Sequence, residues 1–253
     1  MMQTKIKTAQ EIKDMRMSGS INGKILSLVQ KNTQVGMTTK DMANIAATEL
    51  KRLGGEAPFL GYYGFTDIIC ISINDEVIHG IPDDRHIIKN GDIVSIDFGV
   101  KYNGMITDAA RTFVVGNTSS AERLLIQKTE EALMAGISVV KSNTRVGDIA
   151  NSIETVLRKA NLGIVKDYVG HAVGHEIHED PNIPNYGRAG TGESLYAGMT
   201  IAIEPMATLG GSGVYVEADG WTVRTNDGSR AAHFEDTVLI TKDGHEILTR
   251  TAE

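Results

Sequence analysis

The 253-residue sequence has one cysteine, five prolines and few aromatic residues. The single cysteine, Cys70, excludes an internal disulfide and is typical of a reducing compartment. No stretch reaches the roughly 18 consecutive apolar residues of a membrane-spanning helix, and the amino terminus lacks the apolar core of a signal peptide. The sequence therefore predicts a cytoplasmic protein that does not enter a membrane.

Positive charge is also scarce, because 25 Lys and Arg residues are outnumbered by 32 Asp and Glu residues, and the formal net charge is −7. The chain has no basic cluster of the kind that binds nucleic acid or an anionic membrane surface. It also has no linker-like stretch rich in Ser, Pro or Gln. We therefore expect one domain, residues 1–253. Nothing in the sequence predicts an obligate interface, so we expect a monomer.

Helix and strand signals predict one order of elements twice, two helices followed by strands. A capping box, Thr8 to Glu11, begins the first predicted helix. The repeated order predicts an α+β fold of two duplicated halves related by a pseudo-twofold axis. The predicted helices cover residues 8–31, 39–53, 120–141 and 146–160, and the predicted strands cover residues 68–74, 92–113, 199–206, 213–225, 233–241 and 245–249.

Two aspartates lie on one face of a predicted hairpin. Asn103-Gly104 favours a two-residue turn between strand-like runs. In the resulting register Asp97 and Asp108 are diagonal neighbours, about 7–8 Å apart at the backbone, from where two carboxylates can converge on ions between them. A lone strand aspartate usually faces solvent or caps a turn, but two on one face favour a metal site. The opposing pairs in this register are Tyr102–Met105, Gly99–Asp108 and Asp97–Ala110.

Two glutamates occur in further strand-like runs. Glu204 ends the run from Met199, and Glu235 lies in the run 233–241. Glutamate is a poor strand former, and burial of an unpaired carboxylate is costly unless a metal binds it. With Asp97, Asp108 and His171, these residues have the composition of a two-metal hydrolytic site.

His171 lies in a segment, residues 170–181, that has two interpretations. His171, His175 and His178 would share one face of a helix, which would predict a mononuclear zinc site. The two glycines and the proline of this segment disfavour a helix, and the H-E-x-x-H spacing of zinc proteases is not met. We therefore expect an irregular strand and loop.

These residues lie within a pattern that resembles the type I methionine aminopeptidases, in their short bacterial form, over nearly the whole chain. The resemblance implies the pita-bread α+β fold, with a central antiparallel sheet and helices outside. It implies removal of the initiator methionine from nascent proteins with a small second residue, and a transient contact with the ribosome. The matching segments are Cys70–Asn74, Val77–Pro82, Gly91–Asp97, Asp108, Gly170–His171, His178–Glu179, Gly198–Met206, Asp219–Val223 and Glu235.

The resemblance also implies roles for individual residues. His79 and His178 would contact the substrate or the tetrahedral intermediate beside the metals. We expect Glu204 to move a proton from a metal-activated water to the leaving amine. Two divalent ions, cobalt, manganese, iron or zinc, would be held by Asp97, Asp108, His171, Glu204 and Glu235. The expected methionine pocket consists of Phe59, Tyr62, Phe65, Cys70 and Trp221, whereas Tyr63 is expected to fill the core beneath a loop.

The chain departs from the family pattern at three positions that bear on the shape of the pocket. Ala172 stands where a second glycine is usual, His175 where another residue is commoner, and Ile177 where an aromatic is frequent.

One rival function is an X-proline dipeptidase or aminopeptidase of the same fold. Such enzymes usually carry a further amino-terminal domain, which we do not expect here because the first helix begins by residue 8. A second rival is a metal-free binding module, which the presence of all five ligand residues disfavours.

Overall fold

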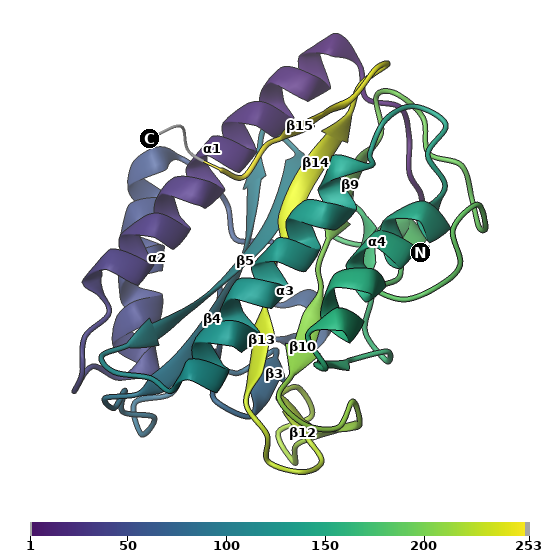
Figure 1. The fold of residues 1–253 in the computed structure, drawn as a ribbon. Helices are drawn as coiled ribbons and strands as arrows, with labels where there is room; N and C mark the ends of the chain where they lie inside the picture. The colour runs from purple at the N-terminus through teal and green to yellow at the C-terminus, as the bar shows by residue number, and fades with distance from the viewer. Residues whose placement is uncertain (1, 251–253) are drawn as a thin grey trace.

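The computed structural model describes residues 2–250, and within them four α-helices lie outside the strands. The helices are α1 (Ala9–Asn32), α2 (Thr39–Leu53), α3 (Ser120–Ser138) and α4 (Val146–Lys159). Figure 1 shows α1 and α2 along one side of the strands and α3 and α4 packed together on the other half. The four predicted helices are confirmed, and the third ends at Ser138, three residues before the predicted end. No helix in the described part of the chain is long and apolar enough to cross a membrane.

Capping explains why three of the helices begin where they do. Thr8, Thr38 and Ser119 each accept a hydrogen bond from the backbone three residues on, and the acidic residue there bonds back to the cap. These reciprocal bonds satisfy N–H groups that have no partner inside the helix. The helix starts were therefore readable from local sequence.

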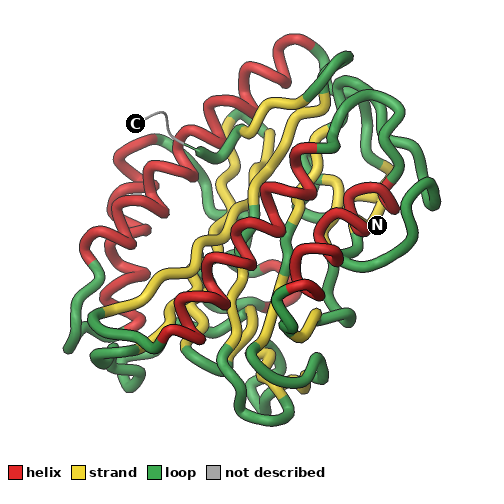
Figure 2. The backbone as a smooth tube through the Cα atoms, viewed as in Figure 1, coloured by secondary structure: helices red, strands yellow, loops and turns green. Residues whose placement is uncertain are grey.

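The strands form several sheets between the helices, as Figure 2 shows in yellow. The largest has the order β1-β8-β7-β9-β14-β15 and is antiparallel except for the pairing of β1 with β8. A second sheet has the order β2-β4-β5, and the smaller sheets are β13-β10-β6 and β11-β12-β3. The strands are β1 (Met2–Gln3), β2 (Cys70–Ile73), β3 (Glu76–Ile78), β4 (Asp92–Tyr102), β5 (Met105–Val115), β6 (Gly163–Ile164), β7 (Gly170–Ala172), β8 (Glu179–Ile183), β9 (Thr200–Ile203), β10 (Met206–Thr208), β11 (Val214–Val216), β12 (Val223–Thr225), β13 (Ala231–His233), β14 (Asp236–Ile240) and β15 (His245–Ile247).

The β4–β5 hairpin has the register predicted from its turn. Asn103 and Gly104 have φ angles of 47° and 85°, the positive values that a type I′ turn requires. Asp97 consequently pairs with Ala110, and Gly99 pairs with Asp108. The two aspartates therefore lie on one face of the hairpin.

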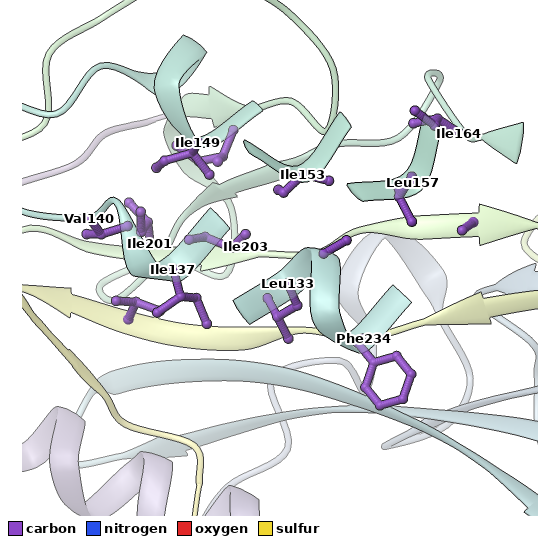
Figure 3. Close-up of a cluster of buried hydrophobic side chains, with 14 of the residues drawn as sticks. Leu133, Ile137, Val140, Ile149, Ile153, Leu157, Ile164, Ile201, Ile203 and Phe234 are labelled. Carbon is purple, nitrogen blue, oxygen red and sulfur yellow. The ribbon is translucent and has the colours of Figure 1, made fainter. Parts of the chain in front are cut away.

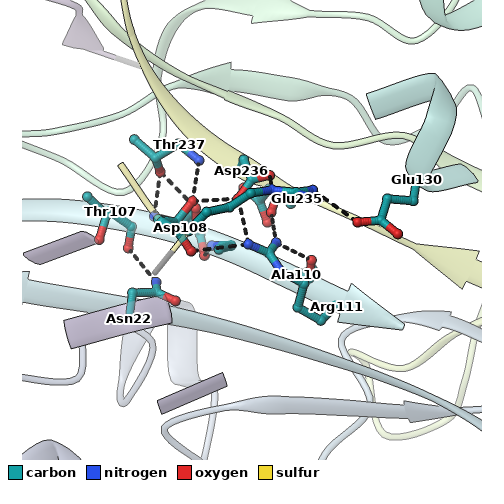
Figure 4. A network of polar contacts seen from close by, with 12 residues as sticks. Asn22, Thr107, Asp108, Ala110, Arg111, Glu130, Glu235, Asp236 and Thr237 are labelled. Atoms are coloured by element: carbon teal, nitrogen blue, oxygen red, sulfur yellow. Dashed lines mark hydrogen bonds and ion pairs between the residues drawn. The ribbon is translucent and has the colours of Figure 1, made fainter. Parts of the chain in front are cut away.

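A short antiparallel bridge joins the two halves. The Ala110 N–H donates to the Glu235 carbonyl at 3.2 Å, and the Glu235 N–H donates to the Ala110 carbonyl at 3.0 Å. Beside it, the Thr237 hydroxyl accepts from the Asp108 N–H at 2.8 Å and donates to the Asp108 carbonyl at 2.7 Å (Figure 4). Because of these bonds, Asp108 of the first half and Glu235 of the second lie next to each other.

Each half has its own apolar core beneath its helices. In the second half, side chains of α3 and α4 pack against β9 of the large sheet (Figure 3). In the first half, α1 and α2 cover the β2-β4-β5 sheet, with fully buried side chains such as Ile25, Met42 and Phe98. Burial of such a side chain contributes about 1.5–3 kcal/mol. The site between the halves therefore rests on two packed layers. The second core includes Leu133, Ile137, Ile149, Ile153, Ile201 and Ile203.

Three predicted strands are interrupted in the structure, so their extents were wrong. The run 199–206 divides into β9 and β10 at Glu204-Pro205, because proline has no N–H to continue the ladder. The run 213–225 divides into β11 and β12 at a turn that contains Gly220, with φ of 80°. The run 233–241 divides into β13 and β14 around Glu235. Two of the three breaks fall at the predicted glutamate ligands. The short strands β1, β3, β6 and β8 were not predicted.

Candidate metal centre and substrate pocket

Every residue assigned to the site from the sequence lines one cavity between the halves. Five potential metal ligands approach it from different elements. Asp97 and Asp108 come from the β4–β5 hairpin, His171 from β7, Glu204 from the end of β9, and Glu235 from the residue before β14. The structure thus brings together residues that are 138 positions apart at the extremes.

The donor atoms of three residues are close enough to share one ion. One donor atom from each of Asp108, His171 and Glu235 lies within 4.8 Å of the other two, and all three residues are buried. Glu204 adjoins them, with its Oε1 3.6 Å from His171 Nε2. Oε1 of Glu235 and Oδ1 of Asp97 are buried without a hydrogen-bond partner. Because a buried carboxylate oxygen without a partner is costly, these atoms fit a bound cation.

The pKa values of the four carboxylates also indicate a site for a bound cation. Burial, together with the charges of Asp108 and Glu204, raises the pKa of Asp97 well above its ordinary value. Burial raises the pKa of Asp108 to about 7. The pKa values of Glu204 and Glu235 are also raised well above normal, by burial and then by the charge of Asp108. Like charges confined in a low-dielectric space repel each other, so divalent cations would stabilise the ionised cluster.

His171 is held in a state suited to metal binding. Burial lowers its pKa to about 3, so the ring is neutral near pH 7. Its Nδ1 lies 3.0 Å from the Ala172 carbonyl, which fixes the proton on Nδ1 and leaves the lone pair of Nε2 available.

The backbone behind Glu235 is held by a charged network (Figure 4). Arg111 donates to the carbonyls of Ala110 and Glu235, at 2.8 and 2.5 Å, and to Asp236 Oδ1 at 2.6 Å. Arg250 donates to the second oxygen of Asp236 at 2.8 Å. Charge-assisted bonds of this kind fix geometry, so the network holds the junction at which Glu235 enters the site.

Two further histidines line the cavity beside these ligands. His178 Nδ1 lies 2.8 Å from the Tyr62 hydroxyl, and its ring centroid is 4.3 Å from that of His171. His79 adopts a φ of 61°, a left-handed conformation that is uncommon for a non-glycine residue and concentrates at functional sites. Burial lowers the pKa of His79 to about 4 and also lowers that of His178. Both rings are therefore neutral near pH 7.

One wall of the cavity is apolar and aromatic. The Phe65 ring meets Trp221 edge to face at 5.1 Å and meets Phe59 at 6.4 Å. Burial raises the pKa of Cys70 well above its ordinary value, so this residue contributes an uncharged thiol. Ile177, the departure noted in the sequence, lines the same cavity. The result is an apolar pocket beside a polar, acidic centre.

Tyr63 was wrongly predicted to lie in the core. It is 86% exposed, with a φ of 44°. Its ring packs edge on against Tyr62 at 4.7 Å. The crowding of aromatics in this segment gave no sign of the turn that exposes it.

His175 lies apart from the other histidines, which excludes the helical zinc interpretation. Its Nε2 is 2.8 Å from Glu11 Oε1, and residues 174–178 are not helical. The expected irregular strand and loop is confirmed.

One buried histidine beside the site was not identified from the sequence. His233 is 1% exposed, both its ring nitrogens lack hydrogen-bond partners, and its Nε2 is 3.5 Å from Glu204 Oε2. The available signal was its position two residues before Glu235 in one strand-like run.

Comparison with known proteins agrees with this geometry. Residues 13–242 match the model of Metallopeptidase family M24. The chain is 45% identical to the methionine aminopeptidase of Clostridium acetobutylicum over 244 residues, which covers 96% of this chain and 98% of that protein. Its identity to methionine aminopeptidase 1 of Bacillus subtilis is 43%, with the same coverage.

Solved structures show the same relationship. The crystal structure of methionine aminopeptidase from Thermotoga maritima has a TM-score of 0.96 and 44% identity, and the match covers 98% of this chain and 100% of that one. Prolidase from Pyrococcus furiosus is more distant, with a TM-score of 0.78, 26% identity, and coverage of 98% of this chain and 66% of that one. These matches confirm the pita-bread fold and favour the aminopeptidase over its X-proline rival. The chain belongs to the methionine aminopeptidases of metallopeptidase family M24, metal-dependent hydrolases that remove an amino-terminal methionine.

Proposed function

We propose that residues 1–253 form one catalytic domain that uses two divalent ions to remove the initiator methionine from nascent polypeptides with a small second residue. We place this activity in the cytoplasm, on a monomer that contacts the ribosome only transiently. The observation that carries the proposal is the buried cluster, in which oxygens of Asp97 and Glu235 have no protein partner. Its ligands are Asp97, Asp108, His171, Glu204 and Glu235.

The charge of the cluster supports two ions rather than one. Four carboxylates carry four negative charges when ionised, and two divalent cations would neutralise them. A set of oxygen ligands with one imidazole accepts cobalt, manganese, iron or zinc, and availability chooses among them.

When bound, divalent ions would lower the pKa of a water in the site, so that hydroxide is available as the nucleophile near neutral pH. Glu204, at the edge of the cluster, takes the proton that the attacking water loses and delivers it to the leaving amine. When the Tyr62 hydroxyl donates to Nδ1 of His178, Nε2 carries the proton and can donate to the substrate carbonyl oxygen. Neutral His79 holds the scissile nitrogen.

The apolar wall accounts for the preference for methionine. A thioether makes favourable contacts with aromatic edges, and Phe59, Phe65 and Trp221 provide them. Tyr62 and Cys70 line the same cavity. The free α-amino group of the substrate would bind at the metal centre, which restricts cleavage to the chain terminus.

Metal titration and a peptide panel test the proposal. Calorimetric titration of the metal-free protein with Mn²⁺ should give two ions per chain, and a single site would contradict the dinuclear assignment. The panel compares Met-Ala-Ser, Met-Lys-Ser and Ala-Pro peptides with the Mn²⁺-loaded enzyme. Cleavage of Met-Ala-Ser alone is expected, whereas cleavage of the Ala-Pro peptide would favour the X-proline rival. Metal binding without any turnover would indicate a binding module.

A further inference from the structure

The segment that precedes α1 is attached to the loop that carries His178. β1 pairs in parallel with β8, which begins directly after His178. The Thr4 N–H donates to the Asp180 carbonyl at 2.9 Å, and the Lys7 N–H donates to the Gly198 carbonyl at 2.8 Å. The amino-terminal segment, here residues 2–11 with the first turn of α1, is therefore hydrogen-bonded to β8, the strand that follows His178.

A buried ion pair makes the strongest connection in this region. Nζ of Lys7 lies 3.2 Å from Glu179 Oε2 and donates to Thr4 Oγ1 at 3.0 Å, and the Lys7 and Glu179 side chains are both 0% exposed. Burial tends to raise the pKa of Glu179, but bonds from Thr4 and the charge of Lys7 outweigh it and hold the pKa below its ordinary value. The carboxylate is therefore ionised near pH 7.

The second oxygen of Glu179 holds the loop itself. Oε1 accepts the backbone N–H groups of His175, at 2.7 Å, and Glu176, at 3.1 Å. These residues lie three and two positions before His178. One buried carboxylate thus links Lys7 to the backbone that leads to the His178 ring.

Gly174 shows how closely Lys7 fits this loop. Its φ is 150°, and a Cβ added there would lie 2.4 Å from Cε of Lys7. The stem of Lys7 therefore occupies the space that a side chain at residue 174 would need. The Gly174 carbonyl also accepts from the Ile106 N–H at 2.7 Å, which ties the loop to β5.

His175 provides a second, partly exposed connection. Its Nε2 lies 2.8 Å from Glu11 Oε1, while Glu11 Oε2 accepts the Thr8 N–H at 2.7 Å in the capping box of α1. The side chains of His175 and Glu11 are 22% and 29% exposed. The loop is therefore attached to the start of α1 as well as to Lys7.

We propose that Lys7, Glu179 and His175 are positioning residues for His178, through which the amino-terminal segment fixes the loop 174–178 and aims the His178 ring into the cavity. A buried ion pair is weak evidence for net stability, because desolvation offsets its attraction, but its hydrogen bonds fix geometry. The inference rests on the proposed role of His178 in turnover.

A double-mutant cycle tests whether Lys7 acts through His178. In the Mn²⁺-loaded enzyme, Lys7→Met should lower kcat/KM for Met-Ala-Ser by about 10- to 100-fold, the cost of a misplaced catalytic group, with most of the loss in kcat. In a His178→Ala background the same substitution should change kcat/KM by less than about twofold, because the group it positions is gone. Equal losses in both backgrounds would overturn the inference.

The metal-free protein provides a readout independent of turnover. The His178 ring resonances, identified by their loss in His178→Ala, should shift in Lys7→Met and, by less, in His175→Ala. Leu26→Ala, a core substitution on the buried face of α1, is the matched control, because it lowers stability without touching the loop and should leave those resonances in place. Unchanged His178 resonances in folded Lys7→Met would refute the proposal.

One further variant and the turnover of His178→Ala separate a failure to fold from a failure of the role proposed for His178. If Lys7→Met does not fold, Lys7→Met/Glu179→Gln replaces it, because it removes both buried charges together. Normal turnover of His178→Ala would contradict the role proposed for His178. Slow turnover of His178→Ala with an additive Lys7→Met effect would instead contradict only the positioning role.

Discussion

Replacing Glu235 with glutamine should make the metal-free protein more stable, although it removes a proposed ligand. The carboxylate is buried, its Oε1 has no hydrogen-bond partner, and one of its oxygens lies within 4.8 Å of an Asp108 oxygen. Glutamine keeps the shape and an acceptor oxygen but removes the charge. The substitution therefore isolates the repulsion that metal ions would relieve.

The magnitude follows from the separation of the charges. Two unit charges 4.8 Å apart repel by about 3.5 kcal/mol at an effective dielectric constant of 20, and by about 0.9 kcal/mol in water. The free energy of unfolding of the metal-free protein should therefore rise by about 1–3.5 kcal/mol in Glu235→Gln when both groups are ionised. Burial of the new amide reduces this gain.

The gain should depend on pH with a defined sign. Burial raises the pKa of Asp108 to about 7, and burial and neighbouring carboxylates raise that of Glu235. Groups with raised folded-state pKa values contribute stability below their unfolded values, near pH 4, and this stability is lost as the pH rises through the folded-state values. The repulsion between the carboxylates of the wild type is therefore strongest at pH 8, where Glu235→Gln should raise the free energy of unfolding most. The gain should be smallest near pH 5.

Urea unfolding followed by circular dichroism measures these differences in EDTA and in Mn²⁺. With Mn²⁺ at 1,000 times its dissociation constant each bound ion adds about 4 kcal/mol to the wild type, and the variant, which lacks a ligand, should gain less, so its advantage over the wild type shrinks. Glu179→Gln is the matched control, since its carboxylate is equally buried but paired with Lys7, and it should lose about 3–5 kcal/mol with or without Mn²⁺. A metal-free Glu235→Gln protein that is less stable than the wild type at pH 8 would refute the reasoning.

Four other substitutions give shorter tests. Asp97→Ala should abolish turnover and reduce bound metal with little loss of fold, and normal activity would contradict its role as a ligand. His178→Ala should lower turnover with metal content unchanged, so a loss of metal would disprove the assignment. Trp221→Ala should reduce discrimination between methionyl and leucyl peptides by about 1–3 kcal/mol in kcat/KM, and a larger effect on stability would make it a packing residue. Glu11→Ala should lower the free energy of unfolding by about 1 kcal/mol at pH 7. Because the bond from Thr8 depresses the Glu11 pKa to about 2, this difference should vanish between about pH 4.5 and 2 in acid titrations of both proteins.

Local chemistry explains which parts of the fold were predictable. The capping boxes at Thr8, Thr38 and Ser119 and the Asn103-Gly104 turn each act over a few residues, and the structure has the predicted helices and hairpin register. The break of the run 199–206 has a local cause in Pro205, and the break of the run 213–225 has one in the turn at Gly220, whereas the break of the run 233–241 was not predictable because it depends on a partner far along the chain. The N–H and carbonyl of Glu235 pair with Ala110, 125 residues earlier, rather than continuing a strand from His233.

The same distinction separates the residues that line the site from those that hold it. Asp97, Asp108 and Glu235 stood out in the sequence because an acid in an apolar strand needs a chemical reason. Thr237 bonds both backbone groups of Asp108, and Lys7 pairs with Glu179 across 172 residues. Neither residue stands out from its neighbours in the sequence. Their importance lies only in what they touch. A sequence can therefore predict the reacting groups of such a site, whereas the residues that fix the directions of those groups require coordinates.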